Sequence, residues 1–178
     1  LSVWSQKKWD GGGGDSLWSN PFNWSPDGVP AAAELVYLDN EWVTTDYAVV
    51  MPGGMITTTI HSLQLQPGVS KQIRLTLPIS NTASPGLNLS SIDTALYIGH
   101  GGVFINASGA PAGNAIVLTG KIKIENGGKY SHQTTRGNAL LISSLVITPE
   151  NRNCIFEFNV PGNSAYTISG SGRNFRTL

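Results

Sequence analysis

Short runs in which apolar and polar residues alternate recur along most of this 178-residue chain. A period of two places every second side chain on one face of a β-strand, so each run predicts a strand with one buried face. Clusters of glycine, proline and asparagine separate the runs and favour tight turns. No helix is predicted, so we expect an all-β chain. The predicted strands lie at residues 35–39, 47–51, 60–66, 73–77, 96–98, 103–105, 116–118, 121–124, 140–147, 155–158 and 166–168.

The spacing of these strands bears on the choice between two all-β folds. Four strand centres lie at Leu63, Leu96, Ile122 and Leu145, which are 33, 26 and 23 residues apart. A loose repeat of this length predicts one repeat per coil of a solenoid, a right-handed parallel β-helix in which similar apolar residues stack above one another. The alternative is a β-sandwich, because turns such as Asn126-Gly127 are typical of hairpins.

The N-terminal region is rich in tryptophan, since four of the five tryptophans lie within the first 24 residues, among glycines and prolines. This composition disfavours a helix and predicts a compact aromatic loop. The end of a solenoid exposes strand edges, which natural solenoids cover with an atypical cap. We therefore expect a single domain over residues 1–178, with a cap at 1–34 and β-coils at 35–178. Trp18, Phe22 and Trp24 are expected to lie over the first coil.

Part of this region has a recognisable pattern. Residues Trp9 to Pro30 combine four successive glycines with the sequence Asn23-Trp24-Ser25-Pro26. This segment resembles a motif of large secreted bacterial surface proteins with a right-handed parallel β-helix, often called adhesin-like or haemagglutinin-like. The resemblance implies attachment to surfaces or glycans, and a location outside a Gram-negative bacterium or on its outer surface. We also expect the chain to be part of a longer protein.

Charge and cysteine content restrict the possible partners. Eleven basic and eleven acidic residues cancel, and only 12% of residues are charged. No sustained field attracts nucleic acid or anionic lipid, and no apolar run approaches the ~20 residues that span a bilayer, so neither nucleic-acid binding nor membrane insertion is expected. Cys154, the only cysteine, is predicted to be a buried, inert thiol. Open strand edges at the C-terminal coil predict self-association there.

Two motifs raise the alternative of an enzyme. Gly99-His100-Gly101 and the later Lys121-Ile122-Lys123 are similar to short motifs of β-helical polygalacturonases, so the chain could be a fragment of a β-helical polysaccharide hydrolase or lyase. Hydrolysis of a glycosidic bond needs two carboxylates about 5 to 9.5 Å apart. Between Glu41 and His100 the sequence has only Asp46 and Asp93. We therefore predict that His100 is a corner residue hydrogen-bonded to the backbone, and we expect no enzymatic activity.

A calcium site is the one cofactor that the sequence suggests. Asp10, Asp15 and Asp27 lie in or beside glycine-rich turns, where carboxylate and carbonyl oxygens can surround a hard cation. The sequence does not match the known nonapeptide calcium repeat, because Ser16 stands where that repeat requires aspartate. Turn and capping roles are therefore expected for these aspartates, and no cofactor is predicted.

Aromatic rings are the remaining candidates for ligand binding. Trp and Tyr rings stack on the apolar faces of sugars, and neutral polar side chains can complete the hydrogen bonding. We select Trp4, Trp9, Trp42 and Tyr130 as candidate glycan-binding residues, with packing of these rings into the cap as the alternative. The predicted function is a non-enzymatic adhesin-like module that binds a glycan or a host or cell surface. A purely structural stalk without a ligand is a further alternative.

Overall fold

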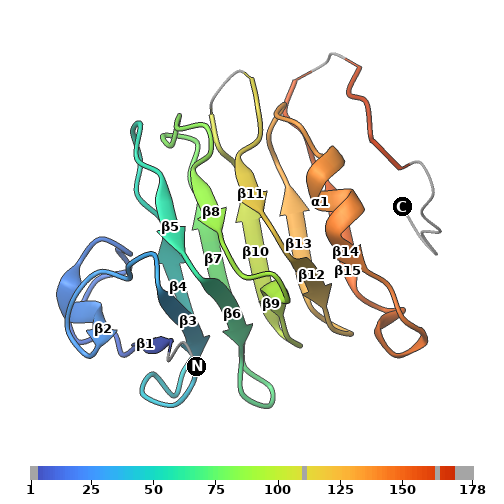
Figure 1. Ribbon diagram of the computed structural model, residues 1–178. Helices are drawn as coiled ribbons and strands as arrows, with labels where there is room; N and C mark the ends of the chain where they lie inside the picture. The colour runs from blue at the N-terminus through green and yellow to red at the C-terminus, as the bar shows by residue number, and fades with distance from the viewer. Residues whose placement is uncertain (1–3, 110–111, 163–164, 171–178) are drawn as a thin grey trace.

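A computed structural model of the chain describes residues 4–109, 112–162 and 165–170. It shows a parallel β-solenoid of three sheets, whose coils stack along one axis (Figure 1). Neighbouring strands come from successive coils and run parallel, whereas β1 and β2 pair antiparallel in the cap. The predicted solenoid is confirmed, and the β-sandwich is not the fold.

The sheets contain seven, five and three strands. In spatial order, the seven-stranded sheet consists of β14 (Leu145–Val146), β12 (Lys121–Ile124), β9 (Thr94–Ile98), β6 (Ser62–Gln66), β3 (Glu34–Asp39), β1 (Ser5–Trp9) and β2 (Trp24–Ser25). The five-stranded sheet consists of β15 (Ile155–Phe158), β13 (Lys129–His132), β10 (Gly102–Asn106), β7 (Ile73–Leu77) and β4 (Tyr47–Val50). The three-stranded sheet consists of β11 (Ile116–Leu118), β8 (Leu87–Leu89) and β5 (Thr58–Ile60). The helical segments are α1 (Ala139–Ser144) and the 3-10 turns Pro21–Asn23 and Pro149–Asn151.

The core consists of apolar residues stacked from coil to coil. Val36, Leu63, Leu96, Ile122 and Leu145 are partners in register on adjacent strands, and each is almost fully buried. Four of these residues are the strand centres whose spacing predicts the solenoid, so that spacing measures the length of each coil. Full burial of such a side chain stabilises the fold by about 1.5–3 kcal/mol.

The N-terminal cap is an aromatic cluster. Trp24 lies edge-on to both Trp9 and Trp18, with ring centroids 5.1 and 4.7 Å apart, and all three side chains are buried. The Trp24 Nε1 donates to the Trp18 carbonyl at 2.8 Å. The prediction for Phe22 is wrong, because its side chain is 62% exposed. Phe22 lies in a 3-10 turn capped by the Asn20 side chain, and this turn directs the ring outward.

Two predicted strands differ in the structure. Most of the predicted strand at 140–147 is helix α1, and only Leu145 and Val146 form β14. Helix α1 packs against β11, in the position where the three-stranded sheet would continue. The apolar run here is too short for its periodicity to separate strand from helix. The predicted strand at 166–168 is also wrong, since these residues have no regular structure.

Buried polar side chains lie in the later coils. His132 is fully buried, with its Nε2 2.8 Å from the Tyr166 hydroxyl and 3.2 Å from the Arg136 carbonyl oxygen. Burial lowers the pKa of His132 below its ordinary value. The neutral imidazole is therefore the form that the fold favours.

This burial predicts a pH-dependent stability. The unfolded chain binds a proton at a higher pH than the native chain does, so the free energy of unfolding decreases as the pH falls from about 6.5 through the lowered native pKa of His132. Replacement of His132 by Gln is expected to flatten this dependence. Urea unfolding between about pH 5 and 8 measures it for both proteins. Equal slopes in the two proteins would contradict the prediction.

The thiol of the single cysteine is less buried than predicted. Cys154 is partly buried against the core, and desolvation raises the pKa of its thiol. A raised pKa reduces the fraction of reactive thiolate, which agrees with the predicted inert thiol. Ile155 of β15 is 48% exposed at the end of the solenoid. Self-association through this C-terminal coil stays a prediction.

Candidate functional site

Two of the four rings selected from the sequence lie in the core. Trp9 is 2% exposed and stacks on Tyr47, while Tyr130 is fully buried and lies edge-on to Phe104. The Tyr130 hydroxyl accepts a hydrogen bond from Asn106, and burial raises its pKa. A glycan cannot reach either ring in the folded chain. For Trp9, the alternative of a ring packed into the cap is what the structure shows.

The other two rings are exposed but separate from one another. Trp4 is 42% exposed, and one of its faces stacks on His61 with ring centroids 3.8 Å apart. Trp42 is 56% exposed and lies in the loop between β3 and β4, where Asn40 donates to the Val43 carbonyl oxygen. Among the residues that the structure describes, no ring contact joins Trp4 to Trp42.

A row of polar side chains on the outer face of the seven-stranded sheet is a stronger candidate. Its members are partners in register on five adjacent strands, and we call it the tyrosine row: Lys8, Tyr37, Gln64, Tyr97 and Lys123. Adjacent strands lie about 4.8 Å apart, so the two tyrosines, which are two strands apart, are separated by about 10 Å. Both tyrosines and Gln64 are partly exposed.

Each tyrosine has a lysine beside its ring. The Lys8 Nζ lies 5.8 Å from the Tyr37 ring centroid, and the Lys123 Nζ lies 5.8 Å from that of Tyr97. These distances are typical of cation–π contacts. The two ends of the row therefore have the same arrangement.

Carboxylates neutralise both lysines. Lys8 is paired with Glu41 and, at 3.6 Å, with Asp39, and the hydrogen bond to Glu41 is the main cause of its raised pKa. Lys123 is paired with Glu125 at 2.7 Å, which likewise raises the pKa of Lys123. Both lysines are charged at neutral pH, but each has its counter-ion within the protein. The row thus has little net charge.

The centre of the row supplies neutral hydrogen-bonding groups. The Gln64 Oε1 accepts from the Gln66 Nε2 at 2.6 Å, which holds the Gln64 amide in place. Burial, followed by the nearby Glu125, raises the pKa of Tyr97, so its phenol stays protonated. Amide and phenol groups between two rings can hydrogen-bond to the hydroxyl groups of a neutral ligand.

The sequence contains a signal for this row that inspection of single residues does not detect. Tyr37, Gln64, Tyr97 and Lys123 each follow directly the stacked apolar residue of their coil. The residue after each coil marker therefore identifies the row. Its members are far apart in sequence, however, and only the pairing register shows that they are neighbours.

The other polar candidates have local structural roles. Asp15 accepts hydrogen bonds from the Leu17 backbone and from the side chains of Asn20 and Asn23, which lowers its pKa. Its role is therefore the predicted turn and capping role. The His100 Nδ1 lies 3.0 Å from the Asn126 carbonyl oxygen, so the predicted corner histidine is confirmed. Within the described residues, no group of three or more His, Cys, Asp or Glu could hold a metal ion.

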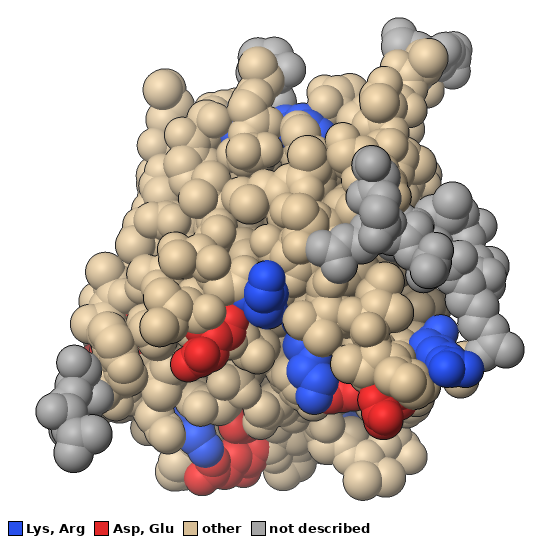
Figure 2. All heavy atoms as spheres, turned by 45° about the vertical axis from the view of Figure 1, so that its right-hand side comes forward, with Lys and Arg blue, Asp and Glu red and all other residues tan. Residues whose placement is uncertain are grey.

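The molecular surface has few charges. Figure 2 shows one face on which most charged side chains lie in the lower half, while the upper half is almost free of them. None of the helices in the described part of the chain has the length and hydropathy needed to cross a membrane.

Fold and surface together define a parallel β-solenoid with an ordered row of polar and aromatic side chains on its longest sheet. Comparisons with protein-family models, with curated proteins and with solved structures find no match. The fold alone therefore assigns the chain to a class, the parallel β-solenoids.

Proposed function

We propose that this chain is a non-enzymatic, adhesin-like module that binds an extended, neutral glycan along the tyrosine row. The observation that supports this proposal is the register of Tyr37, Gln64 and Tyr97 on adjacent strands. The resemblance of the Trp9–Pro30 segment to secreted bacterial surface proteins favours a location outside the cell or on its surface.

The geometry of the row suits a chain of sugar rings. Aromatic side chains present a large apolar surface at a small cost in conformational entropy, and such surfaces pack on the apolar face of a pyranose ring. The separation of about 10 Å between the tyrosines is close to the length of two sugar units in an extended chain. Gln64 lies between the rings, where it can hydrogen-bond to a hydroxyl group of the ligand.

The charges of the row indicate which glycans bind. Because Lys8 and Lys123 are already paired with carboxylates, a uronic acid or a sulfated sugar would have to compete for them. A neutral glycan meets no such competition. We therefore expect neutral polysaccharides to bind better than acidic ones.

Replacement of either tyrosine by alanine is expected to weaken glycan binding about tenfold, which corresponds to about 1.4 kcal/mol. The measurement is binding of the purified chain to an array of cell-surface and plant glycans, followed by titration of the best oligosaccharide. Tyr37→Phe keeps the ring and is expected to retain most of the affinity. Trp42→Ala is the matched control, because it removes an exposed ring outside the row.

Two results would contradict the proposal. Binding that is unchanged in Tyr37→Ala and Tyr97→Ala but lost in Trp4→Ala or Trp42→Ala would move the site to the isolated rings. No binding to any glycan on the array would favour the structural stalk. Circular dichroism of each variant shows whether the solenoid is intact.

A further inference from the structure

At its cap end the three-stranded sheet stops at β5, whereas residues of the cap extend both other sheets, the seven-stranded one by β1 and the five-stranded one by a single bridge. In the seven-stranded sheet, β1 continues the row of strands beyond β3, and beside β4 a parallel bridge joins Leu17 to Val50. Strand β5 is the edge of the three-stranded sheet, and no described strand of the cap pairs with it. The position of one strand is therefore unoccupied at this corner of the first coil.

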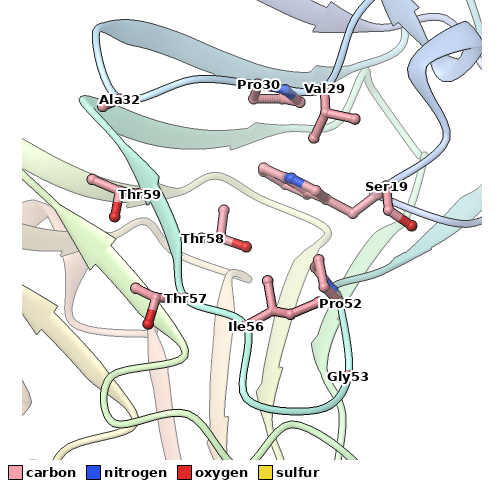
Figure 3. A pocket seen from close by; sticks show the side chains of 11 residues that line it. Ser19, Val29, Pro30, Ala32, Pro52, Gly53, Ile56, Thr57, Thr58 and Thr59 are labelled. Atoms are coloured by element: carbon pink, nitrogen blue, oxygen red, sulfur yellow. The ribbon is translucent and has the colours of Figure 1, made fainter.

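A cavity of about 570 Å³ lies at this position (Figure 3). Val29, Pro30 and Ala32 of the cap line one side, and Ile56 and Thr57–Thr59 line the other. This volume is within the range of about 300–1,000 Å³ that is typical of ligand sites. The lining contains no charged residue, so it suits an uncharged ligand.

Hydrogen bonding along β5 leaves one residue directed at the cavity. The Thr58 N–H donates to the Gly86 carbonyl at 2.9 Å, and the Ser90 N–H donates to the Ile60 carbonyl at 3.2 Å. Thr58 and Ile60 thus use their backbone groups toward β8. Because backbone groups alternate in direction along a strand, the Thr59 N–H and C=O point away from β8, toward the unoccupied position. Among the described residues, neither group has a partner.

Trp18 supplies a second group without a partner. Its side chain lines the cavity and is fully buried, and within the described part of the chain its Nε1 has no hydrogen-bond partner. A buried donor without a partner is unfavourable in the folded chain. Because Trp18 lines the cavity, its indole N–H signal reports on what occupies the cavity.

We propose that the cavity binds an extended, uncharged peptide segment of another protein, which adds a strand to β5 and completes the three-stranded sheet. A peptide is the ligand whose backbone matches both the N–H and the C=O of Thr59. Addition of a strand to an open sheet edge is a common mode of peptide recognition. This site is independent of the tyrosine row, which lies on a different sheet.

The test uses capped pentapeptides copied from the three strands of this sheet, residues 57–61, 86–90 and 115–119, because each already forms an edge-compatible strand in this protein. Nuclear magnetic resonance follows the Trp18 indole N–H and the Thr59 amide during titration. We expect a saturable shift of both signals and slower hydrogen exchange at the Thr59 amide. A scrambled peptide that contains a central proline is expected to produce neither.

Two variants locate the site. Thr59→Pro removes the free donor at an edge position, where proline is tolerated, and is expected to weaken peptide binding at least about tenfold. Ala48→Pro is the matched control: Ala48 is exposed on the edge strand β4, and its N–H has no partner among the described residues. Ala32→Trp fills the cavity from the cap side and is expected to abolish binding without changing the edge.

The outcomes separate clearly. The proposal is overturned if none of the pentapeptides shifts the Trp18 and Thr59 signals, or if Thr59→Pro binds as tightly as Ala48→Pro. If Thr59→Pro does not fold, Ala32→Trp decides, because unchanged affinity in that variant would show that the peptide binds elsewhere.

Discussion

Replacement of Trp24 by alanine is expected to lower the free energy of unfolding by about 3–5 kcal/mol. The ring of Trp24 is fully buried between Trp9 and Trp18, and its Nε1 bonds to the Trp18 carbonyl. The substitution leaves a cavity in the cap and a buried carbonyl without its donor. It also weakens the antiparallel pairing of β2 with β1, which protects the N-terminal edge of the seven-stranded sheet.

Urea unfolding followed by circular dichroism measures this change, and light scattering measures aggregation through the uncovered edge. Trp42→Ala is the control, because Trp42 is 56% exposed and makes no ring contact within the described residues. Its expected effect is within about 0.5 kcal/mol of zero. A loss below about 1 kcal/mol for Trp24→Ala would mean that the aromatic cluster is not required for the cap.

Replacement of Arg136 by methionine is expected to lower the free energy of unfolding by about 2–4 kcal/mol. The Arg136 side chain is 1% exposed, and its guanidinium donates to the Ala83 carbonyl, the Ser108 hydroxyl and the Asn114 carbonyl at 2.7–2.8 Å. Methionine fills a similar volume but leaves these acceptors without a partner.

The contacts of Arg136 join three successive coils, so the loss is expected to affect the whole solenoid rather than one loop. Arg136→Lys is expected to be destabilised as well, because a single ammonium group cannot reproduce the planar arrangement of donors. Arg74→Met, at an exposed position on β7, is the control. If Arg136→Met were as stable as the parent protein, the cost of burying the charge would equal or exceed the value of its hydrogen bonds.

The coils are predictable from sequence because their determinants are local. The alternation around Leu63 and Leu96 selects strands, and turns such as Pro67-Gly68 separate them. Repetition then favours stacking, which the register of these residues confirms. Helix α1 is not predictable in the same way, because its apolar run is short and packing against β11 decides its conformation.

The site is less predictable because it depends on contacts between distant residues. The sequence around Trp9 does not show that this ring turns inward, whereas Trp4, five residues earlier, stays partly exposed. Tyr130 looks like a surface residue until Phe104 is placed beside it on the neighbouring strand. Tyr37 and Tyr97, in turn, become one surface only when β6 lies between them.

The helix that ends the three-stranded sheet has a consequence for how such a molecule can vary. The cap covers one end of the stack and α1 covers the last strand of the smallest sheet, so both special elements lie outside the two regular coils β6–β8 and β9–β11. Insertion of a whole regular coil between β6–β8 and β9–β11, or deletion of β6–β8, would leave the cap and α1 with their existing neighbours, because α1 packs against β11. Each added coil would lengthen the rod by about 4.8 Å. Duplication of the gene segment that encodes one coil can therefore change the length of the solenoid in fixed steps, without changing the cap or α1.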